Sequence, residues 1–277
     1  MTIDEIITKA LEEDLGDGDH TSLSTIPAEA RGKAQLLVKQ EGTIAGIEIA
    51  RKVFEQVDPE TKFTALLKDG DTIKKGDIAF VVEGKSISLL SSERLALNFL
   101  QRMSGIATQT QKILSLIEGT STKILDTRKT TPLMRPIEKL AVKIGGGENH
   151  RMGLYDMIMI KDNHVDFAGG IVPAIKACKE YLKEKDKDLK IELEVRNFAE
   201  LEEALNYGEI HRIMLDNFSP SLTSKALKMI DGRFETEASG GINKHNIREY
   251  AETGVDYISV GALTHQIKSL DLSLKAV

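Results

Sequence analysis

The sequence contains one cysteine, no tryptophan and no long apolar run. Cys178 is the only cysteine among 277 residues, so an internal disulfide is excluded, and free cysteines are usually small packed residues. No apolar run reaches the roughly 18 residues that a transmembrane helix needs. The start of the chain also lacks a basic segment followed by an apolar one. We therefore expect no export signal and a cytoplasmic location.

The sequence also has no excess of positive charge. Its net charge is −6, which argues against binding to nucleic acid or to an anionic membrane, because both need a basic surface. Hydrophobic residues make up 41% of the chain, enough for a real core. The length suits one barrel domain with a smaller partner, or two ordinary domains.

The first part of the chain has the texture of short strands and helices. After an amphipathic N-terminal helix and a GDGDH turn, we expect strands in AQLLVKQEG, KFTALLKDGD, DIAFVVEGK and SISLLS. Asp69-Gly70 and Glu83-Gly84 are expected at hairpin turns. IEIARKVFEQV has helical spacing. A long helix should begin at Ser91, with Gly105 marking a bend or a close backbone approach.

From Lys123 onward, β-rich runs alternate with helical ones. The expected strands are KILDT, DMIMIKD, KIELEV, RIMLD, FETEAS and YISVG, and the last four start about twenty residues apart, as successive βα units do. This order predicts an α/β barrel. The carboxyl ends of barrel strands converge on one face, where active sites form.

The ends of these strands carry most of the informative side chains. They are Arg128, Lys129, Lys161, Glu192, Glu194, Asp216, Ser239, Gly240, Gly241 and Gly261. Arg128, Lys161 and the nearby pair His150-Arg151 supply positive charge, which suits a ligand with several anionic groups. The ordinary alternative is a set of ion pairs with neighbouring acids.

Carboxylates and glycines at the same ends suggest two further functions. Glu194 and Asp216, on neighbouring strands, suit oxygen ligation of Mg²⁺, and Glu192 is a second candidate two residues from Glu194. The SGGI and VGAL segments follow the last two strands. Backbone N–H groups there can hold a phosphate, although a plain turn would explain them too.

Longer motifs resemble one enzyme family over essentially the whole chain. They are ERLALNFLQRMSGIAT, DTRKTTP, GGGENHRMGLYDMIMIKDNH, LDNF, EASGGI and SVGALTH. Together they are similar to the nicotinate-nucleotide pyrophosphorylases, also called quinolinate phosphoribosyltransferases. The resemblance implies a type II phosphoribosyltransferase with an N-terminal α/β sandwich domain and a C-terminal incomplete α/β barrel. We place these at residues 1–108 and 109–266, with the tail 267–277 free to join the first domain.

The resemblance also implies a reaction and a set of roles. The enzymes convert quinolinate and phosphoribosyl pyrophosphate (PRPP) to nicotinate mononucleotide, pyrophosphate and CO₂, with Mg²⁺ and without an organic cofactor, in NAD biosynthesis. Arg128, His150, Arg151 and Lys161 would contact quinolinate, joined by Arg94 of the partner subunit in a homodimer with shared active sites. Lys129 would lie between quinolinate and PRPP. Glu194 and Asp216 would serve ribose and metal, directly or through water, and Ser239, Gly240, Gly241 and Gly261 would hold the 5′-phosphate.

Three other interpretations stay open at this stage. A Schiff-base aldolase or lyase could use Lys129 or Lys161, which both follow strands. A barrel that binds a phosphorylated metabolite without turnover would leave Glu194 and Asp216 without a task. A paralogue of the same fold, associated with molybdate transport, could have a different substrate. The sequence does not predict whether dimers assemble further.

Overall fold

The computed structural model describes residues 1–277, and its contacts divide the chain into two compact units. The first unit comprises residues 1–112, 129–147 and 263–277, and the second comprises residues 113–128 and 148–262. The segment 129–147 groups with the first unit, although the sequence boundary at 108/109 placed it in the barrel domain. No helix is both long and apolar enough to span a membrane.

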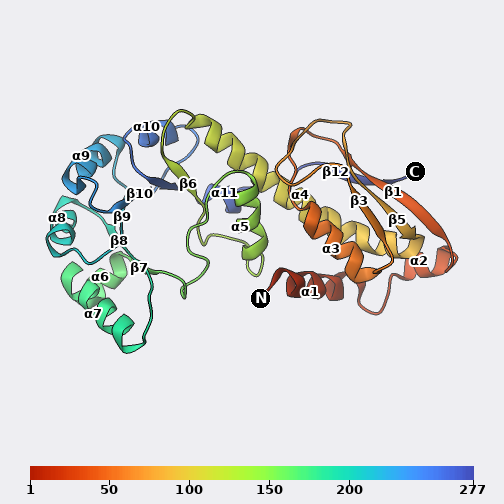
Figure 1. The fold of residues 1–277 in the computed structure, drawn as a ribbon, viewed down its shortest axis with the longest axis horizontal. Helices are drawn as coiled ribbons and strands as arrows, with labels where there is room; N and C mark the ends of the chain where they lie inside the picture. Colours follow the sequence, from red (N-terminus) through yellow and green to blue (C-terminus); the bar gives the residue numbers. More distant parts are fainter. The chain divides into compact units, whose positions relative to one another are not determined.

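The first unit is built on a four-stranded antiparallel sheet in the order β12–β1–β5–β3 (Figure 1). The bounds are β1 Arg31–Val38, β3 Lys62–Ala65, β5 Ile78–Lys85 and β12 Leu272–Ala276, with β2 Gly42–Thr43 and β4 Thr72–Ile73 forming a separate small ladder. Along β1, Ala34, Leu36 and Val38 are buried and alternate with more exposed residues. The chain's last strand therefore completes the sheet that its first strand begins.

Helices complete this unit. They are α1 Ile3–Leu15, α2 His20–Thr25, α3 Ile47–Val57, α4 Ser86–Leu116, α5 Arg135–Ile144 and the short α11 Ala262–His265, of which α4 ends and α11 begins in the second unit. Thr2 and Glu5 form a capping box at α1. Gly16, in the GDGDH segment, has a φ of 52° and ends this helix, which confirms the predicted turn.

Three local predictions in this region were wrong, and one of them is the start of the long helix at Ser91. SISLLS is not a strand, because α4 begins at Ser86, directly after β5. Glu83 and Gly84 lie inside β5 rather than at a turn, and they pair with β1. A glycine can stay in a strand where space is tight, and a Cβ on Gly84 would lie 3.3 Å from the Thr61 hydroxyl.

The predicted close approach at Gly105 is confirmed. A Cβ at this position of α4 would lie 2.5 Å from the main-chain oxygen of Lys268. Any side chain would push the segment before β12 away from the helix. The glycine therefore allows the C-terminal segment to pass over α4.

The second unit contains one six-stranded parallel sheet in the order β6–β11–β10–β9–β8–β7. Its strands are β6 Lys123–Leu125, β7 Ile158–Ile160, β8 Ile191–Val195, β9 Arg212–Asp216, β10 Glu235–Ser239 and β11 Tyr257–Ser259. All six predicted strands are present. The end strands β6 and β7 do not pair with each other, so the barrel is incomplete, as expected.

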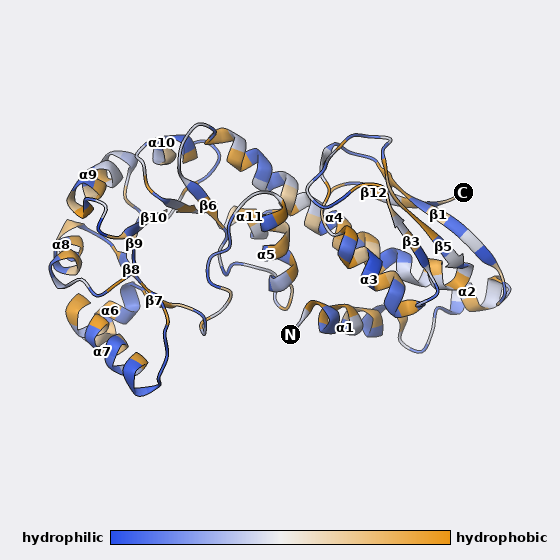
Figure 2. Cartoon of the chain, in the orientation of Figure 1, coloured by the Kyte–Doolittle hydropathy of each residue, from blue (hydrophilic) through white to orange (hydrophobic).

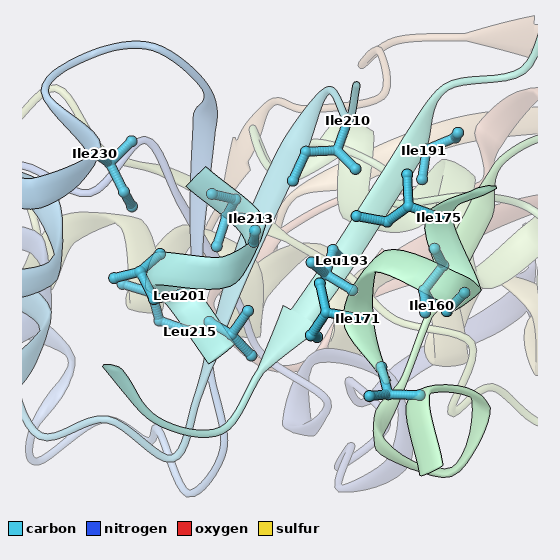
Figure 3. Packing of buried hydrophobic residues seen from close by; sticks show 14 of the residues in the cluster. Ile160, Ile171, Ile175, Ile191, Leu193, Leu201, Ile210, Ile213, Leu215 and Ile230 are labelled. Carbon is cyan, nitrogen blue, oxygen red and sulfur yellow. The ribbon is translucent and has the colours of Figure 1, made fainter. Parts of the chain in front are cut away.

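Helices cover the outer face of this sheet (Figure 1). They are α6 Asp162–Ala168, α7 Ile171–Glu184, α8 Phe198–Tyr207, α9 Pro220–Ile230 and α10 Ile247–Ala251. Figure 2 shows apolar and polar residues interleaved along α7. Figure 3 shows the apolar layer, in which Ile175 of α7 and Leu201 of α8 belong to one buried cluster with Leu193 and Ile213 of the strands. Burial of this layer drives folding of the unit.

Candidate active site

The inner face of the parallel sheet is polar. Successive strand residues point to opposite faces. In β8, Ile191, Leu193 and Val195 belong to the outer apolar cluster. Glu192 and Glu194 therefore both point inward, at two depths. Both are buried. The sequence left open which of the two faces the site, and the structure shows that they differ in depth rather than in the face of the sheet.

Three predicted residues meet at the carboxyl ends of β7, β8 and β9. The Lys161 ammonium forms an ion pair with the Glu194 carboxylate. Burial raises the pKa of Asp216 above its ordinary value, and the charge of Glu194 adds to the rise while Lys161 opposes it. Asp216 also accepts a hydrogen bond of 2.6 Å from the Asn217 amide. Two carboxylates and one ammonium thus share this end of the sheet.

A buried aspartate after β6 organises the NHR segment. Asp126 is fully buried and accepts the His150 main-chain N–H at 2.8 Å. Its other oxygen accepts the Asn149 amide at 2.5 Å. Asp126 opens the DTRKTTP motif, and Asn149-His150 lies in the second motif, so this carboxylate joins the two. Sequence reasoning gave Asp126 no role, although an acid followed by cations at a strand end was a usable signal.

Arg128 and Arg151 are brought together by this anchoring. Burial lowers the pKa of Arg151, and the nearby positive charge of Arg128 lowers it further. The Arg151 guanidinium donates to the main-chain oxygen of Met157 at 3.1 Å, while Asp156 accepts the main-chain N–H groups of Met152 and Gly153. Two neighbouring guanidinium groups favour binding of an anion.

His150 lies deeper than the other cations of its motif. Its Nε2 is 3.1 Å from a Glu192 oxygen and 3.3 Å from a Glu237 oxygen, and both carboxylates are fully buried. Burial alone would lower the pKa of His150. Hydrogen bonding and charge from Glu192 and Glu237 outweigh that effect and raise it to about 9. The prediction that His150 contacts quinolinate is untested, but this nitrogen faces the carboxylates.

Both possible protonation states of the His150 imidazole place a proton on Nε2. The Arg151 main-chain N–H lies 2.6 Å from His150 Nδ1, a contact that a neutral imidazole accepts. The two carboxylates instead favour a second proton, because Arg212 alone does not neutralise them. The contact to Arg151 favours an Nδ1 without a proton, whereas the two carboxylates favour a protonated Nδ1. Both are consistent with a hydrogen on Nε2.

Arg212 lies one layer below His150. Its guanidinium is 3.3 Å from Glu237, 4.0 Å from Glu192 and 3.0 Å from Glu235. It also stacks 4.1 Å above the Tyr257 ring. Sequence reasoning gave Glu237 only a place at a strand end and gave Arg212 none. Arg212 and Glu237 lie on neighbouring strands, and both side chains alternate with residues of the outer face. That spacing was the signal in the sequence that could have placed them in the barrel interior.

The glycine segment after β10 has a shape that requires glycine. Gly240 has a φ of 93°, and a Cβ there would lie 2.3 Å from the Asn217 side-chain oxygen. Gly241 has a φ of 65° with open space around the position of a Cβ. The half-buried Ser239 is the last residue of β10, and the half-buried Gly261 lies between β11 and α11. The phosphate-binding role of these four residues stays a prediction.

Lys129 and Arg94 belong to the first unit, and both are exposed. The main-chain oxygen of Lys129 accepts a hydrogen bond of 2.9 Å from Thr264. Thr131 lies in the loop that follows, and its main-chain N–H donates at 3.1 Å to the fully buried Glu138 of α5. Glu138 also forms an ion pair of 2.7 Å with Arg102. The RKTTP loop is therefore held by side-chain hydrogen bonds.

A cavity of about 430 Å³ lies in the second unit and borders the predicted site only at Arg151. It is lined mainly by apolar side chains of β7, α6 and α7, including Met157, Ile158 and Cys178, with Arg151 and His164 also in its wall. Apolar walls do not suit a substrate with several negative charges. The charged strand ends are the better candidate.

Two groups could hold a cation. Glu194 and Asp216 fit Mg²⁺, because they are neighbouring carboxylates and the charge of one raises the pKa of the other. His150, Glu192 and Glu237 also bring three ligand-type atoms within 4.8 Å of one another. Mg²⁺ prefers oxygen ligands, and the second group includes an imidazole nitrogen. The first group therefore fits the predicted magnesium site better, and the site stays a prediction.

Comparison with known proteins decides the family. Residues 19–104 match the model for the quinolinate phosphoribosyl transferase N-terminal domain, and residues 106–275 match the model for the C-terminal domain. The chain belongs to the quinolinate phosphoribosyltransferase family. As a member of this family, it carries both domains in the usual order.

Relatives of this phosphoribosyltransferase are similar along their length. It is 45% identical to quinolinate phosphoribosyltransferase [decarboxylating] 1b from Nicotiana tabacum, over 98% of this chain and 81% of the relative. It is 41% identical to a probable nicotinate-nucleotide pyrophosphorylase [carboxylating] from Bacillus subtilis, over 99% and 93%. The crystal structure of NadC from Streptococcus pyogenes matches with a TM-score of 0.92 at 38% identity, covering 99% of this chain and 97% of that one.

Proposed function

We propose that this chain transfers the phosphoribosyl group of PRPP to the ring nitrogen of quinolinate and releases CO₂, pyrophosphate and nicotinate mononucleotide. The observation that carries the proposal is the meeting of cations and carboxylates at the carboxyl ends of the strands. Arg128 and Arg151 lie together after β6, and Lys161, Glu194 and Asp216 lie together after β7 to β9. Membership of the family fixes the class of reaction.

The cations would bind and orient quinolinate. Its two carboxylates suit the paired guanidinium groups of Arg128 and Arg151 and the ammonium of Lys161. Binding of both quinolinate carboxylates by these cations would direct the ring nitrogen toward the ribose of PRPP. Orientation of this kind removes much of the entropic barrier to a reaction between two molecules. Lys161 is already paired with Glu194, so quinolinate would have to share or displace that carboxylate.

The transfer step separates charge. The lone pair of the ring nitrogen forms a bond to the anomeric carbon of PRPP as the bond to pyrophosphate breaks, and pyrophosphate leaves with that electron pair. Glu194 and Asp216 would stabilise the cationic ribose, and Lys129 would stabilise the leaving group. Mg²⁺ bound near Glu194 and Asp216 would neutralise phosphate charge. Ser239, Gly240, Gly241 and Gly261 would hold the 5′-phosphate through backbone N–H groups.

Decarboxylation follows without a protein nucleophile. The carbon–carbon bond to the carboxylate beside the nitrogen breaks, its electrons move toward the positive pyridinium, and the ring carbon takes a proton from solvent. No organic cofactor is needed for this sequence. A Schiff-base mechanism at Lys161 would require this lysine to leave its ion pair with Glu194.

The experiment is a comparison of two substrates. Purified protein is incubated with PRPP, Mg²⁺ and either quinolinate or nicotinate, and nicotinate mononucleotide is measured, with Mg²⁺ omitted from a parallel sample. We expect turnover of quinolinate alone and a strict need for Mg²⁺. Turnover of nicotinate but not of quinolinate would contradict the proposal. Turnover of neither by folded protein would favour a binding protein or the transport paralogue.

The assembly and the location are further parts of the proposal. A homodimer would let Arg94 of the partner subunit reach quinolinate, which is consistent with the exposure of Arg94 on α4. A cytoplasmic location fits an enzyme that consumes intracellular PRPP. Neither nucleic acid nor membrane is expected as a partner, given the net charge of −6.

A further inference from the structure

Three buried charges around His150, those of Glu192, Glu237 and Arg212, have no task in the proposed chemistry. Glu192, Glu237, His150 and Arg212 form an ion cluster in the barrel interior, below the layer that contains Glu194. Barrel interiors are usually filled by bulky apolar side chains. Buried ion pairs seldom stabilise a fold more than well-packed apolar residues do. The cluster therefore calls for a reason other than stability.

The carboxylates of this cluster are incompletely satisfied. Both oxygens of Glu192 and one oxygen of Glu237 are buried without a well-aligned hydrogen bond. A buried polar atom without such a bond destabilises the folded state. Glu237 is better supported, since the nearby Ser259 hydroxyl and the Arg212 charge help to lower its pKa. What both carboxylates share is attraction to His150.

We infer that Glu237 is a positioning residue that holds His150 and, through it, Arg151. The inference rests on the proposed function, because Arg151 matters here as a contact to quinolinate. Glu192 shares the task at the same nitrogen, His150 Nε2. Neither of the two carboxylates that hold His150 needs to touch the substrate.

The connection from Glu237 to Arg151 is short. The His150 side chain is fixed by Glu192 and Glu237, and its main-chain N–H is fixed by Asp126. Arg151 is the next residue, and its main-chain nitrogen lies 2.6 Å from His150 Nδ1. A displaced imidazole would therefore lose this contact to the Arg151 main chain.

Arg151 needs such support because its neighbour has the same charge. The positive charge of Arg128 lowers the pKa of Arg151, so the two guanidinium groups repel each other before an anion binds. The charge of Glu192 opposes this repulsion. A segment fixed at His150 keeps Arg151 beside Arg128 and prepares the pair for a carboxylate. Preorganisation of this kind is paid for during folding rather than during binding.

The test is the Glu237→Gln variant, which keeps size and one acceptor oxygen but removes the charge. We expect KM for quinolinate to rise about tenfold, because a displaced Arg151 would bind and orient quinolinate less well. KM for PRPP should stay within about twofold of the wild-type value. The matched control is Glu235→Gln on the same strand, which contacts Arg212 but not His150. Its two KM values should match those of the wild type.

A second variant covers the case in which Glu237→Gln does not fold. Ser259→Ala removes a hydroxyl that helps to lower the pKa of Glu237 and leaves every charge in place. It should show a smaller rise in KM for quinolinate alone. A merely structural role would instead lower thermal stability and change both KM values together, or neither, and that result would overturn the inference.

The wild-type protein separates the two proposals. Wild-type turnover with no selective effect in Glu237→Gln or Ser259→Ala would reject the positioning role and leave the proposed function standing. Absence of wild-type turnover would reject the proposed function and the inference together.

Discussion

Individual side chains in the barrel interior differ in task according to depth. Lys161, Glu194 and Asp216 lie at the strand ends, where a substrate can reach them. His150 and Glu192 lie one layer deeper, where the contacts are between protein groups. Sequence spacing put Glu192 and Glu194 on the same face, but depth along the barrel decides which of them can meet a ligand.

Replacement of Lys161 by alanine tests the residue scale most simply. The change removes one cation that would bind quinolinate and leaves Glu194 without its partner. We expect kcat/KM for quinolinate to fall by a factor on the order of a hundred, the usual cost of one preorganised contact. Lys179→Ala is the control, because this lysine forms a surface pair with Glu209. Full activity of the Lys161→Ala protein would exclude Lys161 from the site.

At the scale of elements, the strands were predictable and their connections less so. The six strands of the parallel sheet have short apolar runs with distinct ends, and all are present. SISLLS was misread as a strand because its apolar residues alone do not distinguish a strand from the first turn of α4. Glu83-Gly84 looked like a turn, but its pairing partner in β1 is far away in sequence.

The site shows the same limit. The cations of the NHR segment were visible as a run of charges, and a resemblance to a family supplied their roles. Asp126 and Arg212 were not found, because their importance comes from contacts between β6 and the loop after residue 147, and between β9 and its neighbours. Such contacts depend on the pairing of strands, which single-sequence patterns do not give.

The segment between β10 and α10 carries a prediction of its own. Gly240→Ala would place a Cβ against Asn217 at a φ of 93°, so the segment must move. We expect KM for PRPP to rise and the free energy of unfolding to fall by about 2 kcal/mol or more. Gly232→Ala is the matched control, because its φ of 68° is similar but no atom lies within 4 Å of its Cβ. It should cost only about 1 kcal/mol and leave KM for PRPP unchanged.

That prediction fails if both alanine variants have the same KM for PRPP as the wild type. Urea unfolding and steady-state kinetics on the three proteins supply the two measurements. Equal destabilisation by the two variants would show that Asn217 can move aside.

At the scale of the whole molecule, stability should depend on pH through His150. Its pKa is raised in the folded state from 6.5 to about 9, so the folded protein binds the proton more tightly than the unfolded chain does. The contribution of His150 is therefore complete below pH 6.5 and lost as pH rises through 9. It amounts to roughly 3 kcal/mol in the free energy of unfolding.

Denaturant titrations at several pH values between 6 and 10 check this. A His150→Asn variant should be less stable than the wild type at pH 6, and the difference should shrink toward pH 10. A constant difference across this range would show that His150 stays in one protonation state.

Sharing of active sites between subunits can be tested by mixing. Arg94→Ala and Lys161→Ala proteins should each be nearly inactive. In a mixed population of dimers, half of the sites in each heterodimer would be intact, so the mixture should recover about a quarter of wild-type activity. The two proteins are unfolded and refolded together, with each refolded alone as the control. No recovery by dimers that do exchange would place Arg94 in its own subunit's site or outside any site.

The most direct measurement follows the carbon that leaves. Quinolinate labelled in the carboxylate beside the ring nitrogen is incubated with the protein and Mg²⁺, with and without PRPP, and released CO₂ is compared with nicotinate mononucleotide formed. The account predicts equal amounts of the two products and no release without PRPP. Release without PRPP, or nucleotide formed with the label retained, would contradict it.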